Sequence, residues 1–322
     1  MTGLDVFNPI SSELSQVEID LLASIDTDLP ILAEAATHLI KAGGKRLRPA
    51  FALLSAKVFS DEVCHAIPLA VSLELIHMAS LVHDDVIDNS ELRRGQPTVK
   101  SRWGNRLSVC TGNYVLAKSL SLTADYLNRD VIEVVADTSM SICDGEIRQM
   151  RTCYDVTQGL KEYLRRIERK TALLISVSCQ LGAMINGASR EDVEALKRYG
   201  YYLGMAFQIT DDILDFVAEE DVLGKPVGSD IRQGVITLPA IYALRCSPHR
   251  VKLAAMLSSP ESCASRAEEI VDLIIDSDGI DYAHYASHRF AERALRQLDH
   301  LPEVPVIESF YRIADFISGR EY

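Results

Sequence analysis

Two short acidic clusters have the residue types and the spacing that divalent metal binding requires. Both have the form Asp-Asp-x-x-Asp, and their members are Asp84, Asp85, Asp88, Asp211, Asp212 and Asp215. On a helix, the first and last aspartates of each cluster lie one turn apart, with Cβ atoms about 5–6 Å from each other. Proteins hold Mg²⁺ with one or two carboxylates together with phosphate oxygens and waters. Two facing helices with such clusters are therefore predicted to clamp a polyphosphate through several Mg²⁺ ions.

A single cluster of this kind is more often a solvated helix face, on which like charges four residues apart repel each other. Both clusters here follow apolar stretches, "LIHMASLVH" and "GMAFQIT", rather than charged ones. The repetition of the motif in an apolar context favours a metal site over a solvated surface.

Four further segments carry basic residues, and three of them lie beside glycines or next to an acidic cluster. The segments are "AGGKRLRPA" with Lys45, Arg46 and Arg48, "ELRRGQPT" with Arg93 and Arg94, "RKTALL" with Lys170 and Thr171, and "LGKPVGSDIRQG" with Lys225. Arg binds phosphate oxygens through paired N–H groups, and Lys binds them as a point charge. Each segment alone is ordinarily surface charge. Together with the acidic clusters they predict two diphosphates, one bound through Mg²⁺ and the other directly by Arg and Lys.

Long helices are expected to position these residues. No proline occurs between Thr98 and Lys225, and apolar residues recur at helical spacing in segments 130–150, 160–185 and 189–216. Asn186-Gly187 is a candidate helix C-cap and Ser189 a candidate N-cap. Because the alternation typical of strands is almost absent, the sequence predicts one all-α domain, a helical bundle with sites between facing helices.

Composition narrows the class of protein further. The 322 residues are 48% apolar, enough for a sizeable core, and the net charge of −13 argues against a nucleic acid or an anionic membrane surface as partner. Neither a signal peptide nor a membrane-spanning run is expected. The seven cysteines are scattered, with no CxxC pair and no zinc-like spacing. They are interpreted as reduced thiols of a cytoplasmic protein.

Five segments resemble the characteristic blocks of the trans-isoprenyl (polyprenyl) diphosphate synthases, in the order of that family and from about residue 38 to residue 245. They are "GGKRLRP", "LIHMASLVHDDVID…LRRGQPT", "KTALLISVSCQLGA", "GMAFQITDDILDF" and "LGKPVGSDIRQG…TLP". Several stretches are most similar to the large catalytic subunit, component II, of the heptaprenyl branch. The resemblance implies a single polyprenyl synthetase domain over residues 1–322, an all-α bundle with a central active-site cavity. It also implies condensation of isopentenyl diphosphate with an allylic diphosphate such as farnesyl diphosphate.

The resemblance also implies a role for each candidate residue. Asp84, Asp88 and Asp211 would bind Mg²⁺, two to three ions per site, with Asp85, Asp212 and Asp215 in direct or water-mediated support. Arg93, Lys170, Thr171, Gln208 and Lys225 would hold the allylic diphosphate, with Lys170 counted among the catalytic residues. Lys45, Arg48, His77 and Arg94 would hold isopentenyl diphosphate without metal. The released diphosphate would accept the proton, since no protein base is evident.

Two local features bear on activity and on product length. Many family members have Lys where this chain has Val235 after Gly234, which removes one cation expected near the metal-bound diphosphate. Ala79 and Ser80, one turn before Asp84, are small and leave a path for a growing tail. A long all-trans product is therefore expected, heptaprenyl by resemblance, for a quinone side chain such as that of menaquinone. Hexaprenyl, octaprenyl and solanesyl products are the alternatives.

Three other classes of protein share part of this pattern. A class I terpene cyclase has the first acidic motif but typically an Asn/Ser/Glu set in place of the second. A non-catalytic partner subunit would have lost the acidic residues. A calcium-binding or scaffold protein would not need the basic residues. The resemblance implies either a heterodimer with a small regulatory subunit or a homodimer.

Overall fold

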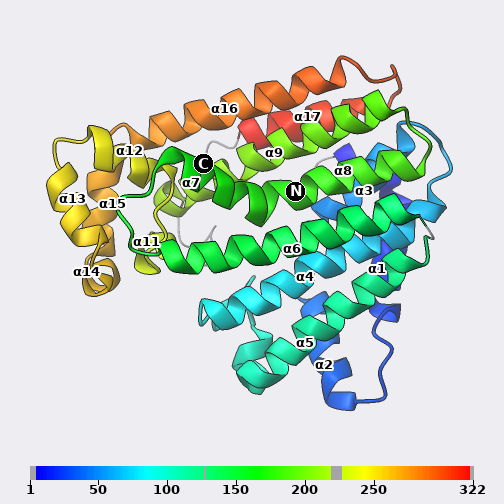
Figure 1. Ribbon diagram of the computed structural model, residues 1–322, viewed down its shortest axis with the longest axis horizontal. Coiled ribbons are helices and arrows are strands. Elements are labelled where there is room, and N and C mark those ends of the chain that lie inside the picture. Colours follow the sequence, from blue (N-terminus) through cyan, green and yellow to red (C-terminus); the bar gives the residue numbers. More distant parts are fainter. Residues whose placement is uncertain (1–4, 127, 219–226, 320–322) are drawn as a thin grey trace. The chain divides into compact units, whose positions relative to one another are not determined.

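The computed structural model describes residues 5–126, 128–218 and 227–319, and almost all regular structure in these ranges is helical (Figure 1). The N-terminal elements are η1 (Asp5–Ile10), α1 (Ser11–Ala23), α2 (Pro30–Lys41), α3 (Leu47–Lys57), η2 (Cys64–Ala66), α4 (Ile67–Ile87), β1 (Leu92–Arg93), β2 (Gln96–Pro97), α5 (Val99–Ala124) and α6 (Arg129–Thr152). The remaining elements are α7 (Leu160–Ile167), η3 (Glu168–Ala172), α8 (Leu173–Ile185), α9 (Arg190–Val217), α11 (Ser229–Arg232), α12 (Leu238–Cys246), α13 (Arg250–Leu257), α14 (Pro260–Ser265), α15 (Ala267–Ile275), α16 (Gly279–Leu298) and α17 (Ile307–Ser318).

Helices are present in all three predicted segments, 130–150, 160–185 and 189–216, with boundaries close to the predicted ones. Helix α8 ends at Ile185, and Gly187 has the left-handed φ of +76° that favours glycine after a helix. Ser189 precedes α9, and its Oγ accepts a hydrogen bond from the Asp192 backbone N–H at 3.2 Å, as an N-cap does. The predicted segment 160–185 is not one regular α-helix, because residues Glu168–Ala172 form a π-helical turn.

The chain divides into two compact units, which we call unit 1 and unit 2. Unit 1 contains Met1–Ser139, Leu174–Gly200 and Leu298–Arg312; unit 2 contains Met140–Leu173, Tyr201–Gln297 and Ile313–Tyr322.

Unit 1 is organised around α4, which lies beside α5 in Figure 1. Helix α4 is apolar on nearly all sides, and Leu69, Leu73 and Leu75 are fully buried, as expected for a helix in the middle of a core. A second contact joins distant parts of the chain: the hydroxyl of Tyr199 donates to the backbone oxygen of Phe310 at 2.7 Å, with the two rings edge to face. Unit 1 therefore needs residues from three separate stretches of sequence.

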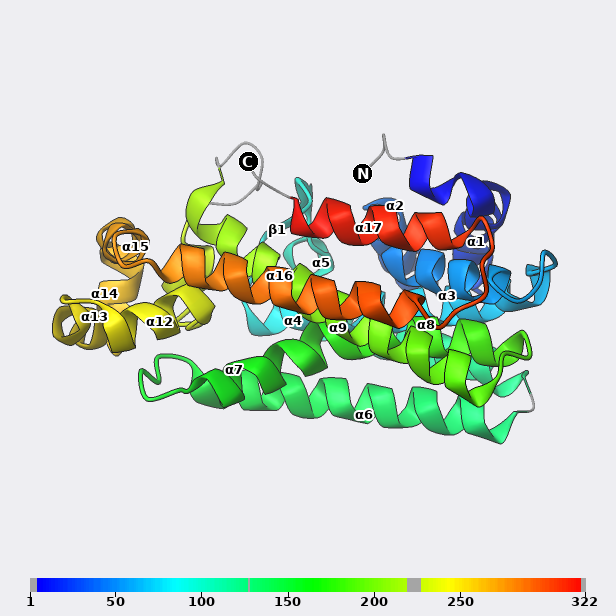
Figure 2. The same ribbon diagram turned by 90° about the horizontal axis from the view of Figure 1, so that it is seen from above.

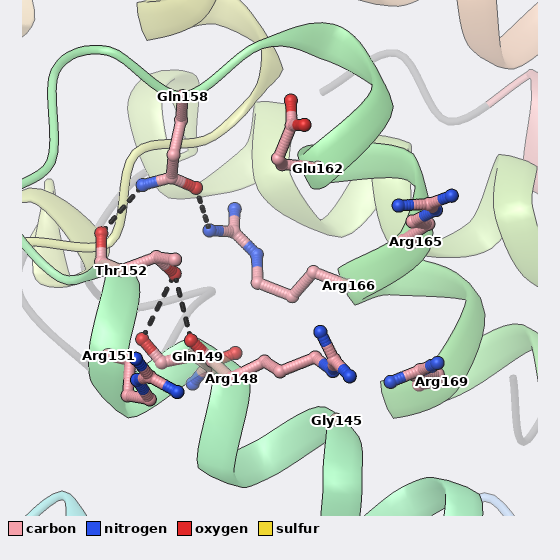
Figure 3. Close-up of a pocket in the computed structure, with 10 residues that line it drawn as sticks. All are labelled: Gly145, Arg148, Gln149, Arg151, Thr152, Gln158, Glu162, Arg165, Arg166 and Arg169. Carbon is pink, nitrogen blue, oxygen red and sulfur yellow. Dashed lines mark hydrogen bonds between the residues drawn. The ribbon is translucent and has the colours of Figure 1, made fainter.

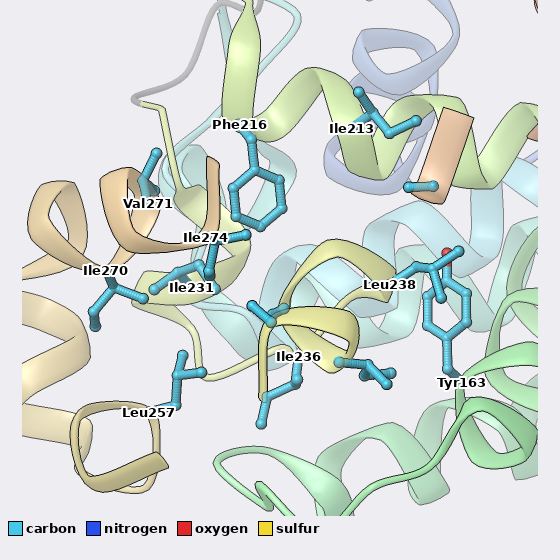
Figure 4. Close-up of a cluster of buried hydrophobic side chains, with 14 of the residues drawn as sticks. Tyr163, Ile213, Phe216, Ile231, Ile236, Leu238, Leu257, Ile270, Val271 and Ile274 are labelled. Atoms are coloured by element: carbon cyan, nitrogen blue, oxygen red, sulfur yellow. The ribbon is translucent and has the colours of Figure 1, made fainter. Parts of the chain in front are cut away.

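Unit 2 has its own apolar core, to which α7, α9 and the short helices α11–α15 contribute (Figure 4). Figure 2 shows α12, α13, α14 and α15 grouped together. Phe216 of α9 and Ile231 of α11 are buried in this cluster, as is Tyr163 of α7. Tyr163 is fully buried although it has a polar hydroxyl. The hydroxyl therefore requires a hydrogen-bond partner inside the core.

Two further expectations concern a membrane and the cysteines. One stretch, Cys64–Ile87, is long and apolar enough to cross a membrane, but 72% of its apolar window is buried inside the structure, as in a core helix. All seven cysteines are free thiols.

Candidate active site

The first acidic motif lies at the C-terminal end of α4. Asp84 and Asp85 are buried, and Asp88 is the C-cap residue, its N–H donating to the Asp84 backbone oxygen at 2.8 Å. Asn89 follows with φ +53°, and the Ser90 N–H donates to the Asp85 backbone oxygen at 3.0 Å, which completes a Schellman motif. The C-terminus of a helix carries partial negative charge, so three carboxylates at this position favour a cation.

Arg93 neutralises part of this charge. Its Nε and Nη2 atoms lie 2.8 and 2.7 Å from Oδ1 of Asp85. Burial nevertheless raises the pKa of Asp85, although the Arg93 guanidinium opposes that shift. The central aspartate of the motif is therefore held by Arg93, and its supporting role toward a metal stays a prediction.

A two-residue hairpin positions both predicted arginines. Strands β1 and β2 pair antiparallel with Arg93 opposite Gln96, and Arg94 and Gly95 form the loop with φ of +53° and +73°. Positive φ at both loop residues defines a type I′ turn, which matches the twist of the strands. For Arg94 this conformation is unusual, and such outliers persist where the surroundings enforce them. The turn directs the guanidinium of Arg94 onto Gly44, where an added Cβ would lie only 2.6 Å from Nη1.

His77 lies within the electrostatic reach of four arginines of unit 1. Burial, followed by the charges of Arg48, Arg94, Arg93 and Arg46, lowers the pKa of His77 well below its ordinary value. The imidazole is therefore neutral at pH 7, and it can offer a diphosphate one N–H donor rather than a charge.

The basic residues of "GGKRLRP" divide into exposed and structural ones. Lys45 is exposed, as suits a substrate-binding residue. Arg46 is buried and adopts the left-handed conformation, and its guanidinium bonds Glu18 of α1, Glu74 of α4 and the Ile40 backbone oxygen. Arg46 thus ties helices together in unit 1.

The second acidic motif lies in the last turns of α9, in unit 2. Asp212 is buried and accepts two hydrogen bonds, from the hydroxyl of Tyr163 at 2.7 Å and from Nε2 of Gln208 at 2.8 Å. Gln208 in turn accepts a hydrogen bond from the hydroxyl of Thr171. Burial, and then the charge of Asp230, raise the pKa of Asp212 to about 7. The predicted allylic-diphosphate residues Thr171 and Gln208 are therefore joined to the second acidic motif by one chain of hydrogen bonds.

Asp215, the last residue of this motif, has a structural contact as well. Its Oδ2 accepts a hydrogen bond from the backbone N–H of Asp230 at 2.9 Å, and this bond ties the start of α11 to the end of α9. Gly234 follows α11 with φ +76°, and a Cβ there would lie 2.4 Å from the ring of Tyr154. Only glycine fits this position, and Val235 then takes the place at which many family members have Lys.

Lys170 and Thr171 lie in the π-helical turn η3, and such turns frequently occur at functional sites. Nζ of Lys170 is 3.4 Å from Oε1 of Gln149 and 3.8 Å from Oε1 of Glu146. The predicted residue Lys225 lies outside the described residues.

The arrangement of the acidic residues bears on whether a divalent metal could bind. Within the ranges that the structure describes, no three His, Cys, Asp or Glu side chains are grouped as a preformed metal cage. Mg²⁺ sites completed by substrate phosphates and waters need no such cage. Both motifs lie at helix C-termini, and a cation would favour the charged form of Asp212, whose pKa burial has raised. The carboxylates therefore suit a cation that arrives with a diphosphate, and their assignment as ligands stays a prediction.

The path expected for the growing tail starts from small residues on α4. Ala79 is buried, and the Ser80 hydroxyl donates to the His77 backbone oxygen at 2.8 Å. Farther down the helix, the hydroxyl of Ser72 is bonded to α5 through the Ser119 backbone oxygen at 2.9 Å. The tail route along α4 stays a prediction.

Acidic motifs at helix ends, accompanied by arginines and lysines, are suited to an enzyme that binds diphosphates with the help of a divalent cation. Residues 29–274 match the polyprenyl synthetase family, so the chain belongs to that family and is a trans-prenyltransferase. It is 45% identical to heptaprenyl diphosphate synthase component 2 of Geobacillus stearothermophilus, over 98% of each chain. The resemblance inferred from the sequence, and with it long-chain trans-prenyl transfer, is confirmed.

Solved structures support the fold. Heptaprenyl diphosphate synthase from Staphylococcus aureus matches with a TM-score of 0.92 at 37% identity, covering 97% of this chain and 99% of that one. A polyprenyl synthase from Caulobacter crescentus, whose crystal structure is complexed with calcium and isoprenyl diphosphate, matches with a TM-score of 0.91 at 32% identity, over 98% of this chain and 97% of that one. The predicted all-α fold of the isoprenyl diphosphate synthase type is confirmed.

Two residues of the site were missed from the sequence. Tyr163, which donates to Asp212, lies far from the motif along the chain, and no local pattern links the two residues. Gly44 was noted only as part of a turn, whereas its missing side chain makes room for Arg94. In both cases the partner comes from a different element, which periodicity and spacing do not reveal.

Proposed function

We propose that this prenyltransferase condenses isopentenyl diphosphate with an allylic diphosphate such as farnesyl diphosphate, and that its product is heptaprenyl diphosphate. The observation that carries the proposal is the presence of two complete acidic motifs, each at a helix C-terminus and each bonded to residues predicted to bind diphosphate. Asp85 is bonded to Arg93 in unit 1, and Asp212 is bonded to Gln208 and so to Thr171 in unit 2.

The metal in this proposal is Mg²⁺, in two to three ions per site. Asp84, Asp88 and Asp211 would be the principal ligands. Asp85, Asp212 and Asp215 would support them, as the family resemblance implies, and each of these three also accepts a hydrogen bond from the protein. When bound, Mg²⁺ neutralises the charge that develops on a departing diphosphate.

The chain's own residues orient the two substrates. Arg94 and Arg48, with Lys45, would bind isopentenyl diphosphate directly, and the neutral His77 would add a hydrogen bond. Lys170, Thr171, Gln208, Arg93 and Lys225 would bind the allylic diphosphate. Apolar surfaces of the core helices would keep water away from the allylic carbon as it becomes cationic, since water would quench it.

The product length and the biological setting follow from similarity and from the small residues of α4. The relatives of similar sequence include a heptaprenyl diphosphate synthase component 2, and the word component in that name indicates a second subunit. We therefore propose that this chain acts in the cytoplasm as one polyprenyl synthetase domain, with a small regulatory subunit or as a homodimer. Its product would supply a quinone side chain such as that of menaquinone.

The test is incubation of the protein with farnesyl diphosphate, labelled isopentenyl diphosphate and Mg²⁺, with and without a candidate small subunit. Products are dephosphorylated and sized by chromatography. We expect a heptaprenyl product that requires Mg²⁺. No incorporation of label with either subunit composition would contradict the function, and a shorter or longer main product would contradict the assigned length.

A further inference from the structure

Unit 2 contains a pocket of about 610 Å³ between the C-terminal half of α6 and helix α7 (Figure 3). Its described lining consists of Gly145, Arg148, Gln149, Arg151, Thr152, Gln158, Glu162, Arg165, Arg166 and Arg169. None of these residues is among the metal or substrate residues predicted from the sequence. The pocket therefore differs from the candidate active site in its lining residues, although Oε1 of Gln149 lies 3.4 Å from Nζ of Lys170 and so places the two side by side. Its size is in the range of small-molecule sites.

The lining has a strong excess of positive charge in a chain whose net charge is −13. Five arginines surround the pocket, while Glu162 is its one carboxylate among the described lining residues. Asp144, just outside, forms ion pairs with two of the arginines, Arg148 and Arg169. Among the residues that the structure describes, no carboxylate lies within ion-pair distance of Arg151, Arg165 or Arg166. These three guanidinium groups therefore form no close ion pair, although the charges of Glu168 and Asp212 still act on Arg165 and Arg166.

Part of this arrangement is held in place before any ligand binds. Gln158 donates to the Thr152 backbone oxygen at 2.6 Å and accepts from Nη1 of Arg166 at 3.3 Å. Nη2 of Arg166 donates to the Ile236 backbone oxygen at 2.8 Å, and its guanidinium lies 5.4 Å from the centre of the Tyr163 ring. Arg166 is thus fixed, whereas Arg151 and Arg165 are exposed at the rim. Preorganised donors lose less freedom when an anion binds.

The chemistry of the lining selects the kind of anion. Guanidinium groups match phosphate oxygens in pairs, and five of them exceed what a single carboxylate or phosphate requires. The described lining has no aromatic ring for a nucleobase to stack on and no large aliphatic side chain for a prenyl tail. We propose that this pocket is a second anion site that binds a compact oligophosphate such as inorganic diphosphate. Prenyl transfer releases diphosphate, so the reaction itself supplies such a ligand; this link rests on the proposed function, whereas the binding itself does not.

The test is calorimetric titration of the full-length protein with inorganic diphosphate in EDTA at low salt. The protein carries Lys45→Gln and Arg94→Gln, so that two of the four residues predicted to bind isopentenyl diphosphate do not contribute. Adding Arg151→Gln and Arg165→Gln should weaken binding about 10- to 100-fold, since each guanidinium contributes one charge-assisted contact, partly screened at the rim. Replacing the same two arginines by lysine keeps the charge and loses the paired geometry, and should give an intermediate loss.

The control adds Arg289→Gln and Arg296→Gln instead, which removes the same charge from exposed positions on α16 in unit 2. It should bind diphosphate as the parent does. Unchanged affinity in the pocket variants, or an equal loss in the control, overturns the proposal. ATP should bind no more tightly than inorganic triphosphate, and a pocket-dependent preference for ATP would overturn the assignment to a compact oligophosphate. Circular dichroism checks that each variant is folded, and because the assay uses neither substrates nor Mg²⁺, its outcome is independent of the proposed reaction.

Discussion

Replacing Gly44 by alanine should weaken isopentenyl diphosphate binding without weakening the fold. The new Cβ would lie 2.6 Å from Nη1 of Arg94, whereas ordinary contacts begin at 3.4 Å, so the guanidinium must retreat by about 0.8 Å. Misplacing a contact by about 1 Å costs as much as 10²-fold in rate, and a charge-assisted hydrogen bond contributes about 1.5–3 kcal/mol. Gly44 does not have the positive φ of Gly43, so alanine introduces no backbone strain.

Steady-state kinetics with isopentenyl diphosphate as the varied substrate measures this effect. We expect KM for isopentenyl diphosphate to rise about tenfold or more, while KM for farnesyl diphosphate stays nearly constant and Tm changes by no more than a surface substitution would cause. The control is a double-mutant cycle with Arg94→Ala, because Gly44→Ala should have little further effect once the guanidinium is absent. If Gly44→Ala raised KM equally in the Arg94→Ala background, or not at all in the wild type, the proposed contact between Gly44 and Arg94 would be refuted.

Three other predictions test the acidic motifs and the tail route. Asp84→Ala and Asp211→Ala should each lower kcat/KM by about 10³-fold with unchanged circular dichroism, since each removes electrostatic stabilisation of the departing diphosphate; near-normal turnover of either at saturating Mg²⁺ would contradict the metal role. Burial raises the pKa of Asp212 to about 7 from 3.8, so between these values the folded state binds a proton that the unfolded chain does not. The metal-free protein should therefore become more stable as the pH falls from about 8 to 6, with a limiting slope of about 1.4 kcal/mol per pH unit in urea titrations. Asp212→Asn should remove this slope, whereas Tyr163→Phe, which deletes a donor to the carboxylate, should move it to higher pH; an unchanged slope in Asp212→Asn would refute the assignment. Ala79→Phe should shorten the products to farnesyl or geranylgeranyl length, because close-packed interiors resist an added ring; unchanged long products on chromatography would exclude a route past this residue.

Much of the fold could be predicted from the sequence because its signals are local. The absence of proline between Thr98 and Lys225, the N-cap at Ser189 and the glycine at 187 placed the long helices. The two acidic motifs were found because their spacing itself carries the chemistry. The π-helical turn at Lys170 was not predicted, since no pattern of apolar residues distinguishes it from an α-helical turn.

Contacts between distant elements account for what the sequence did not show. The buried pair of Arg46 and Glu74 and the bond from Tyr163 to Asp212 each join residues far apart in the chain. The same is true of the arginine pocket, whose described lining comes from α6, α7, the connection between them and the π-helical turn η3. In the sequence its arginines are indistinguishable from the exposed charges of any amphipathic helix.

The way unit 1 is assembled has a consequence for how the protein is made. A ribosome delivers the N-terminal helices first, so α1 to α5 emerge well before the chain reaches Phe310. Tyr199 is made later, and until Phe310 follows it lacks its hydrogen-bond acceptor and one of the two rings on which it packs. An aromatic side chain that is buried in the folded protein therefore lacks part of its packing while the residues between Tyr199 and Phe310 are being made. A premature stop before α17 would disable the unit that carries the first acidic motif, although that motif had been translated long before.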